Sequence, residues 1–566
     1  MKRRLIAPLA GLAMMITACG PGSATSGSGT QPNQAAQASR GLVAVVRVEP
    51  ATVAGRAPRT TGVALYLSKR LFNASLGLLD DNGVAQPDLA ESLPKLNTDT
   101  WQVSADGKMQ TTYRLKPNLA WHDGTPLTTT DFLFSWHVYS TPSITPTSVP
   151  FNVIEDVSAA DDRTLVVKWK QPYPDASGLT ERDGDFPPLP RHVLEDAFNA
   201  GNPDAFLSNP FWTTAYVGLG PYRMVKWEPG AFIDSVAYDG YSLGKAKIPR
   251  FTILFVGDAD TAIAKLAAGE AQLAADDALR TAQVPSVMQQ WGPGGGTAIL
   301  HPSQWRSIAF QFRPEYASPP ALMDPRVRKA LASSIEKPPI NEAIYDGQAT
   351  LADSMVSPTS EAGRAADAQV SKYPYDVRKA EQFMAAAGFT KGSDGTYIGP
   401  GGRVASELRT NAATDNEAEV TILAEAWRQI GFDVHEAVLP ASQAQDGQAR
   451  STFPGMYSYN TGLGAPAARN LTTDRILSAE NHWQGGNYSG WSNSEFDRLT
   501  RAYGVTLDPS ERAQVLASMA KIYSEELPSI SLFFRTQPWV FPSSVTGPHM
   551  APPEGTIPWN IYQWEI

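Results

Sequence analysis

The stretch Trp121-His-Asp-Gly-Thr-Pro-Leu-Thr-Thr-Thr-Asp-Phe-Leu-Phe134 combines a tight turn with the start of a helix. His122-Asp123-Gly124 is typical of a turn after a strand, because Asp and Gly favour turn conformations. Thr128, followed three residues later by Asp131, has the spacing of a capping box before an apolar run. We therefore predict a turn that leads into a capped helix. We expect the turn to serve the structure and not to touch a ligand.

The alternation of strand, cap and helix continues on both sides of this stretch. Residues 43–48 and 251–255 are apolar runs that predict buried strands. Asp258 then caps a helix that ends at Gly269. Further helices are predicted after Asp324, after Asp376 and over residues 417–430. The chain has no internal repeat of fixed period, and this order predicts a mixed α/β protein with two or more sheets.

The composition is that of a large folded protein. The chain has 566 residues, 42% of them hydrophobic and 18% charged, with a formal net charge of -10 and a mean hydropathy of -0.25. These values exclude a disordered chain and a polytopic membrane protein, and the length corresponds to about three or four domain-sized units. The acidic balance argues against nucleic-acid binding. The single cysteine excludes intramolecular disulfides, cysteine-based zinc sites and iron–sulfur clusters.

The first forty residues predict an export signal and a tether. Residues 1–18 begin with basic residues and continue without charge, over a length too short for a transmembrane helix but typical of a signal peptide. Cys19 follows Ile-Thr-Ala, which resembles a bacterial lipobox, so we expect this cysteine to be lipidated. Residues 19–40 are rich in Gly, Ser and Gln and predict a flexible tether. We therefore expect a lipoprotein anchored at the outer face of the bacterial cell membrane, on its periplasmic or extracellular side.

The sequence contains no recognisable catalytic or metal-binding motif. No two of the seven histidines are four residues apart, and no nucleophile elbow, P-loop or dinucleotide-binding glycine pattern is present. The acidic pairs at 183–185 and 258–260 do not continue into a calcium-binding loop. We therefore predict a protein that is not an enzyme and has no metal site and no cofactor. Because any two of the 57 acidic residues could meet in the fold, the alternative hypothesis is a secreted lipoprotein hydrolase acting on polysaccharide or cell wall.

Several segments, taken in order along the chain, resemble blocks of one known family. This family is the family 5 extracellular solute-binding proteins of ABC importers, which bind dipeptides, oligopeptides, nickel complexes and related solutes. The stretch 121–132 resembles its most recognisable block. The other segments that resemble family blocks are 86–92, 218–222 with 227–230, 264–273, 324–331, 376–389 and 495–497. Together they span nearly the whole chain after residue 40.

This resemblance implies a two-lobed type II periplasmic-binding-protein fold of the α/β class, with an extra subdomain in the first lobe. The first lobe would comprise residues 41–290 and 537–566, and the second lobe residues 291–536. A peptide or other polar solute would bind between the lobes, which would close around it. The expected partners are ABC permease and ATPase subunits, and the protein is expected to be a monomer. A protein of this fold that signals or acts as a chaperone instead of importing is a further hypothesis.

Two positions depart from the family pattern. Peptide-binding members hold the amino terminus of the ligand with an aspartate in the second lobe, but the corresponding residues 456–462 (Met-Tyr-Ser-Tyr-Asn-Thr-Gly) contain no acid. A glutamate that is frequent in the first lobe is replaced by Asn73. Because an amide cannot pair with an ammonium group as a carboxylate does, a peptide with a free amine is disfavoured.

The resemblance therefore predicts a ligand site made of amides and aromatic rings. Such side chains suit neutral polar solutes, sugars included, and blocked or long peptides that are recognised through their backbone. Arg306 is the candidate partner for a ligand carboxylate. The predicted ligand-binding residues are Asn73, Trp305, Arg306, Tyr457, Tyr459, Asn460, Trp483 and Asn487.

Overall fold

The structure is a computed structural model of the chain. It describes residues 41–58, 65–145, 148–180, 185–359, 361–399, 401–553 and 555–566. The predicted signal peptide, the predicted lipid-acceptor residue Cys19 and the predicted tether lie outside the described residues. The described part forms one compact unit.

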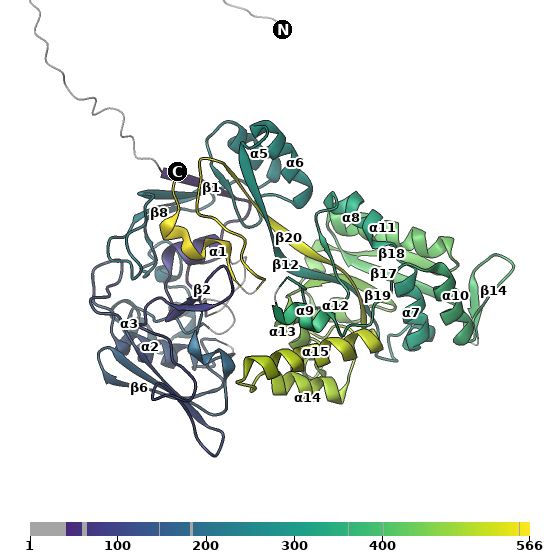
Figure 1. Ribbon diagram of the computed structural model, residues 1–566, viewed down its shortest axis with the longest axis horizontal. Coiled ribbons are helices and arrows are strands. Elements are labelled where there is room, and N and C mark those ends of the chain that lie inside the picture. Colours follow the sequence, from purple (N-terminus) through teal and green to yellow (C-terminus); the bar gives the residue numbers. More distant parts are fainter. Residues whose placement is uncertain are drawn as a thin grey trace, which may run out of the picture. The chain divides into compact units, whose positions relative to one another are not determined.

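Eleven strands of the described residues form one mixed sheet that runs through both predicted lobes (Figure 1). On the side of the predicted first lobe the order is β8 (Tyr222–Glu228), β9 (Phe232–Ala237), β10 (Arg250–Phe255), β1 (Gly41–Val46) and β11 (Leu273–Ala274). On the other side it is β18 (Asp433–Leu439), β17 (Ala405–Asn411) and β19 (Met456–Thr461). β12 (Gly296–Phe310) and β20 (Ser529–Pro542) join the two sides, and β13 (Thr350–Leu351) pairs with β20.

β12 and β20 are long antiparallel neighbours (Figure 1). Their pairing runs from Gly296 opposite Pro542 to Ala309 opposite Ser529, with shifts in register after Pro302 and after Arg306. The predicted lobe boundary at residue 536 falls inside β20, where Thr536 faces Pro302. The connection between the predicted lobes is therefore a hydrogen-bonded pair of strands and not a loop.

The sheet of the predicted first lobe is covered on both faces. One face of β1 belongs to a buried cluster that contains the C-terminal segment of the chain: Leu42, Ala44, Val46, Trp539, Phe541, Ile561 and Trp564. The opposite face, with Val45 and Val540, packs against α5 (Ala259–Ala267) and α6 (Val284–Trp291). Because both faces are buried, β1 is apolar along its whole length. The core of this lobe thus needs residues from both ends of the chain.

The stretch around His122 folds into the predicted turn and capped helix. The backbone N–H of Thr128 donates to the Asp131 carboxylate over 3.0 Å at the start of α2 (Thr129–Tyr139), and Gly124 has a φ of +90°. The Gly218 N–H donates to His122 Nδ1 (3.3 Å), so Nε2 carries the proton and donates to the Gly220 carbonyl (3.0 Å). Burial lowers the pKa of His122 to about 4. The turn therefore fastens residues 218–220, as expected for a structural role.

Residues 218–220 lie directly against the end of α1 (Tyr66–Phe72). The N–H groups of Leu219 and Gly220 both donate to the carbonyl of Phe72, over 3.1 and 3.0 Å. A Cβ atom on Gly220 would lie 2.4 Å from the Leu71 carbonyl oxygen. Glycine is therefore required here because the two backbones are in close contact.

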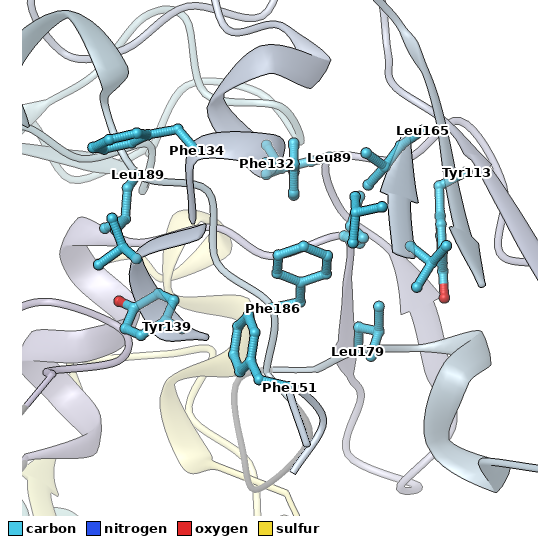
Figure 2. Packing of buried hydrophobic residues seen from close by; sticks show 14 of the residues in the cluster. Leu89, Tyr113, Phe132, Phe134, Tyr139, Phe151, Leu165, Leu179, Phe186 and Leu189 are labelled. Carbon is cyan, nitrogen blue, oxygen red and sulfur yellow. The ribbon is translucent and has the colours of Figure 1, made fainter. Parts of the chain in front are cut away.

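The inserted part of the predicted first lobe has its own sheet and core. Its strands are β4 (Trp101–Val103), β5 (Met109–Arg114), β7 (Thr164–Trp169) and β6 (Ile154–Asp161), with the hairpin β2 (Gly77–Leu79) and β3 (Ala85–Pro87) and the helices α2, α3 (Arg191–Asn199) and α4 (Pro203–Leu207). Phe132 of α2 packs edge-on against Phe186, which also meets Phe151 (Figure 2). The ring centroids are 5.8 and 5.2 Å apart. The apolar residues after the capping box therefore anchor α2 in this core.

Helices cover both faces of the sheet in the predicted second lobe. One face carries α7 (Pro325–Ser333), α8 (Lys337–Tyr345), α10 (Val377–Ala386) and α11 (Thr414–Gln429). The other carries α9 (Glu361–Asp367), α13 (Gly464–Arg469), α14 (Ser494–Tyr503) and α15 (Pro509–Glu526). The remaining elements are the short α12 (Gly447–Ser451) and the small sheet of β14 (Thr390–Lys391), β15 (Tyr397–Gly399) and β16 (Gly402–Arg403).

The predicted helix caps are confirmed. Asp258, Asp324 and Asp376 each accept a hydrogen bond from a backbone N–H in the first turn, over 2.7, 2.8 and 3.0 Å. α11 begins three residues before the predicted start at residue 417, since β17 ends at Asn411 and leaves a short connection. Within the part of the chain that the structure describes, no helix has the length and apolar character needed to span a bilayer.

Candidate functional site

Tyr457 and Tyr459 lie on the same face of β19, because alternate residues of a strand point to the same side. Their rings are stacked, with centroids 5.3 Å apart and planes 6° apart. Tyr488, from a loop, meets Tyr459 edge-on with the centroids 5.4 Å apart. Tyr457 and Tyr459 are buried and Tyr488 is partly exposed, so these three rings form a compact group that we call the tyrosine cluster.

Two polar residues that the sequence did not single out complete this cluster. The Tyr457 hydroxyl donates to Oδ1 of Asn411 (2.8 Å), the last residue of β17. Nε of Arg450, on α12, donates to the same hydroxyl (3.3 Å), and its guanidinium carbon lies 4.1 Å from the centre of the Tyr488 ring. A signal that the sequence contains is the position of Asn411 shortly before the helix predicted over residues 417–430, since ligands of α/β folds bind beyond the carboxyl ends of parallel strands.

Trp305 and Arg306 point to opposite sides of β12. Trp305 is fully buried on the side of α13–α15, where its ring lies edge-on to Tyr523. Arg306 forms an ion pair with Glu419 of α11 (2.8 Å), and both side chains are almost completely buried, with 1% and 0% exposed. A ligand carboxylate would therefore have to compete with Glu419 for Arg306, because Glu419 already pairs with its guanidinium group.

Asn460 faces Arg306 across the pairing of β12 and β19. Its side-chain Oδ1 is buried and has no hydrogen-bond partner among the described residues. A buried acceptor without a donor is unfavourable, so this atom is open to a donor that the free chain does not supply. Asn411 and Asn460 are both partly exposed near the carboxyl ends of parallel strands, but only Asn411 lies on the face of the tyrosine cluster, where it forms a polar rim together with Arg450. Asn460 lies on the opposite face of β19, on the side of Arg306.

Asn487 is a structural brace next to Tyr488. Its side-chain NH₂ group donates to the carbonyls of Leu471, Thr472 and Trp491, over 2.9, 3.1 and 2.8 Å, and its Oδ1 accepts from Gly490 N–H over 3.0 Å. The residue is fully buried. These bonds use both the NH₂ group and the oxygen of the amide, so Asn487 fixes the loop. The next residue, Tyr488, is the one that is partly exposed to solvent.

Trp483 lies in the same loop, with a positive φ of +58°. Its carbonyl oxygen comes so close to Gly447, the first residue of α12, that a Cβ atom there would be 2.2 Å away. The ring is partly exposed. The loop backbone at Trp483 is thus packed against the helix that carries Arg450.

Asn73 lies apart from this group in the chain fold, at the end of α1 in the predicted first lobe. Its side chain accepts from Gly55 N–H (2.8 Å) and from the Tyr216 hydroxyl, and donates to the carbonyls of Val53 and Lys69, both at 2.7 Å. Asn73 therefore holds together the segments that surround the start of the first lobe. Two residues on, the Ser75 hydroxyl donates to the buried carboxylate of Asp185 (3.0 Å).

Two of the tyrosine hydroxyls in the cluster stay protonated. Burial raises the pKa values of Tyr459 and Tyr488, so both hydroxyls are neutral at physiological pH. The Tyr457 hydroxyl bonds to an amide, that of Asn411, and to a guanidinium, that of Arg450. Among the described residues, no group of three or more His, Cys, Asp or Glu side chains is arranged to bind a metal.

Comparison with known proteins places the chain in a family. The model of the bacterial extracellular solute-binding proteins, family 5, matches residues 85–475. The chain belongs to this family. Its members are solute-binding proteins of ABC transporters and not enzymes.

Three relatives of this family 5 protein align with it over most of their own lengths. Heme-binding protein A of Haemophilus influenzae is 24% identical over 561 residues, covering 94% of this chain and 93% of the relative. Oligopeptide-binding protein AppA of Bacillus subtilis is 22% identical over 588 residues, covering 100% and 99%. The dipeptide-binding protein of Escherichia coli is 26% identical over 475 residues, covering 79% and 81%.

Solved structures show the same fold. NikZ of Campylobacter jejuni, in complex with Ni(L-His), has a TM-score of 0.72 at 22% identity, covering 93% of this chain and 99% of the other. The oligopeptide-binding protein of Thermus thermophilus, complexed with a pentapeptide, has a TM-score of 0.72 at 22% identity, covering 93% and 96%. The family 5 protein therefore has the two-lobed α/β fold of periplasmic binding proteins, as the sequence predicted.

Proposed function

We propose that this family 5 protein is the extracytoplasmic solute-binding lipoprotein of an ABC importer. It captures a peptide or other polar solute between two closing lobes and delivers the solute to a membrane permease. The observation that carries this proposal is the family match over residues 85–475. The relatives named for oligopeptides, dipeptides and heme support a role in solute capture.

The paired strands β12 and β20 support closure of the two lobes. The sequence predicted lobe boundaries at residues 290/291 and 536. We propose Pro302 in place of the first, because residue 291 ends α6 and Pro302 faces Thr536 in this pair. A proline cannot donate to the ladder, and the register shifts directly after it, so the sheet is locally weakened at this point. Rotation at this position moves the two lobes as bodies, which is the usual hinge mechanism of solute capture.

The tyrosine cluster and its polar rim are the proposed ligand-facing part of the second lobe. Tyr488, Arg450, Asn411 and Trp483 are partly exposed in this region, and Tyr457 and Tyr459 are buried in the same cluster. Asn460 is partly exposed on the opposite face of β19. Trp305, Arg306 and Asn487 are buried and hold the strand and the loop in place. Asn73 has the equivalent supporting role in the first lobe, where it fastens the end of α1.

Anchoring through Cys19 is part of the same proposal. A lipid on this residue and a tether over residues 19–40 keep the binding protein close to its permease without a membrane-spanning segment. The lipobox-like sequence Ile16-Thr-Ala-Cys19 is the support for this assignment.

The test is a screen of purified protein without its first 40 residues against peptides, sugars and metal complexes. A solute at a hundredfold excess over its Kd is expected to raise the free energy of unfolding by about 2.7 kcal/mol. Small-angle X-ray scattering with and without the hit is expected to show a more compact bound form. Native mass spectrometry of the freshly purified protein identifies any solute that remains bound. Absence of a thermal shift across all of these classes would refute the proposal.

A further inference from the structure

Two arginines near Tyr488, Arg450 and Arg475, form no ion pair with an acid of the described residues. The Arg450 guanidinium lies over the Tyr488 ring at 4.1 Å and donates to the Tyr457 hydroxyl, and among the described residues no carboxylate is in ion-pair distance of it. Nε of Arg475 is buried and has no hydrogen-bond partner there. The Arg475 carbonyl accepts from Gly486 N–H (3.1 Å) and Asn487 N–H (3.0 Å), which places Arg475 beside Tyr488.

Two other arginines of this region have full sets of partners in the protein. Arg409 pairs with Glu407 over 2.7 Å. Arg313 donates to the backbone carbonyls of Leu477 and Tyr488, over 2.9 and 3.0 Å. In contrast, Arg450 meets only the hydroxyl of Tyr457 and the side chain of Tyr488, and no ion pair with a carboxylate is formed among the described residues. The Arg450 guanidinium is only partly buried and has no counterion among the described residues, so it is available to an anionic group of a ligand.

The acidic residues nearest in sequence to Arg450 and Arg475 do not form ion pairs with them. The Asp446 carboxylate caps α12 by accepting from Ala449 N–H (2.9 Å), and the Asp474 carboxylate accepts from the Thr472 hydroxyl (2.5 Å). Both residues are exposed. The charges of Arg450 and Arg475 reach the Tyr488 hydroxyl, where they oppose the rise in its pKa caused by burial. The region around Tyr488 is therefore electropositive.

We propose that the ligand is an anion, and that its carboxylate or phosphate group is held by Arg450, with Arg475 adding positive charge. This inference rests on the proposed function and names the class of solute that the site takes. A guanidinium group presents two parallel N–H donors to an oxyanion, which adds geometric selection to the charge. Residues 456–462 contribute no carboxylate, so this segment offers no ion-pair partner for a ligand ammonium group. The favoured solute is negatively charged and has a blocked or absent amine.

The first experiment compares matched pairs of probes by thermal shift. The pairs are N-acetylated tetrapeptides and their C-terminal amides, and sugar phosphates and their parent sugars. We expect the charged member of at least one pair to stabilise the protein and its neutral partner to have a weaker effect. The peptide arm and the sugar arm distinguish a carboxylate from a phosphate. Equal stabilisation by neutral and charged members, or no stabilisation by any of these probes, would overturn the inference. The proposed function would be overturned only by a negative result in the wider screen of peptides, sugars and metal complexes.

The second experiment assigns the charge to Arg450 by isothermal titration with the best anionic probe. Loss of a charge-assisted hydrogen bond predicts about 10- to 100-fold weaker binding for Arg450→Gln. Arg469→Gln, at an exposed arginine on α13, is the matched control and is expected to bind like the parent protein. Arg450→Lys keeps the charge without the planar fork and is expected to fall between the two.

A folding defect is separated from a binding defect by the unfolding midpoint of each variant. Binding of the anionic probe is also expected to weaken as the salt concentration rises, because salt screens a partly exposed charge. Unchanged affinity of a folded Arg450→Gln variant would overturn the assignment of the anion to this residue.

Discussion

Replacement of Glu419 by glutamine tests how the buried pair with Arg306 contributes to stability. The two carboxylate oxygens of Glu419 accept from Arg306 Nε over 3.0 and 3.1 Å, and one of them also accepts from the Ser458 hydroxyl over 2.6 Å. Neither side chain of the pair has more than 1% of its surface exposed. Glu419→Gln therefore leaves a buried guanidinium without a counterion and places an amide NH₂ donor close to another donor.

The expected loss is about 3–5 kcal/mol in the free energy of unfolding, the range for breaking one partner of a buried ion pair. This is a large fraction of the roughly 5–15 kcal/mol that stabilises a typical folded protein. The measurement is urea unfolding followed by tryptophan fluorescence. Glu495→Gln is the matched control, because its partner Arg498 is three residues away on the surface of α14 and both side chains are more than half exposed. An exposed pair of this kind contributes about 0.2–1 kcal/mol.

A double variant separates the charge from the volume of the pair. Arg306→Met together with Glu419→Leu removes both charges and keeps an apolar filling, which is expected to restore most of the stability lost in Glu419→Gln. If the free energy of unfolding of Glu419→Gln lies within about 1 kcal/mol of that of the parent protein, the ion pair is not a major source of stability. If the double variant is folded but no longer binds any ligand of the parent, then Arg306 contacts the ligand and its assignment as a supporting residue is refuted.

Three further changes test other parts of the structure. His122 has a pKa of about 4 in the fold against 6.5 when unperturbed, so the unfolded chain binds the extra proton between these values. Stability from this group is therefore complete above about pH 6.5 and falls by up to about 1.4 kcal/mol per unit of pH down to about 4; His122→Gln is expected to flatten this slope in urea unfolding at several pH values. Gly220→Ala places a Cβ atom 2.5 Å from the Asn73 nitrogen and is expected to lose about 1–3 kcal/mol, and an unchanged urea midpoint would contradict the close contact. Cys19→Ser is expected to release a soluble protein that still binds its ligand, as fractionation and titration would show, and retention in the membrane fraction would contradict lipid anchoring.

Local features of the fold could be predicted from the sequence because their causes are local. Asp258, Asp324 and Asp376 cap helices through atoms two or three residues away, so the spacing alone contains the information. His122 was correctly assigned to a structural turn for the same reason. Its bond partners at Gly218 and Gly220, about a hundred residues on, were beyond what the spacing could indicate.

The site was harder to predict because its properties depend on pairing between distant residues. Arg306 and Glu419 are separated by 113 positions, and no local pattern shows that they meet. The side of the strand to which Trp305 or Arg306 points depends on register, which is set only when β12, β19 and β20 assemble. Arg450 was missed because a short helix with one arginine has no sequence signature.

The C-terminal segment has a consequence for the order in which this protein acquires its structure. The chain leaves a ribosome or a translocation channel amino terminus first, so domains near the start of a protein usually fold early. Here the core around Leu42 and Ala44 also contains Trp539 and Trp564. The first lobe thus stays incomplete until the last residues have emerged, while the second lobe is already synthesised. We therefore expect the apolar surface around Leu42 and Ala44 to need protection from aggregation until Trp539 and Trp564 have emerged.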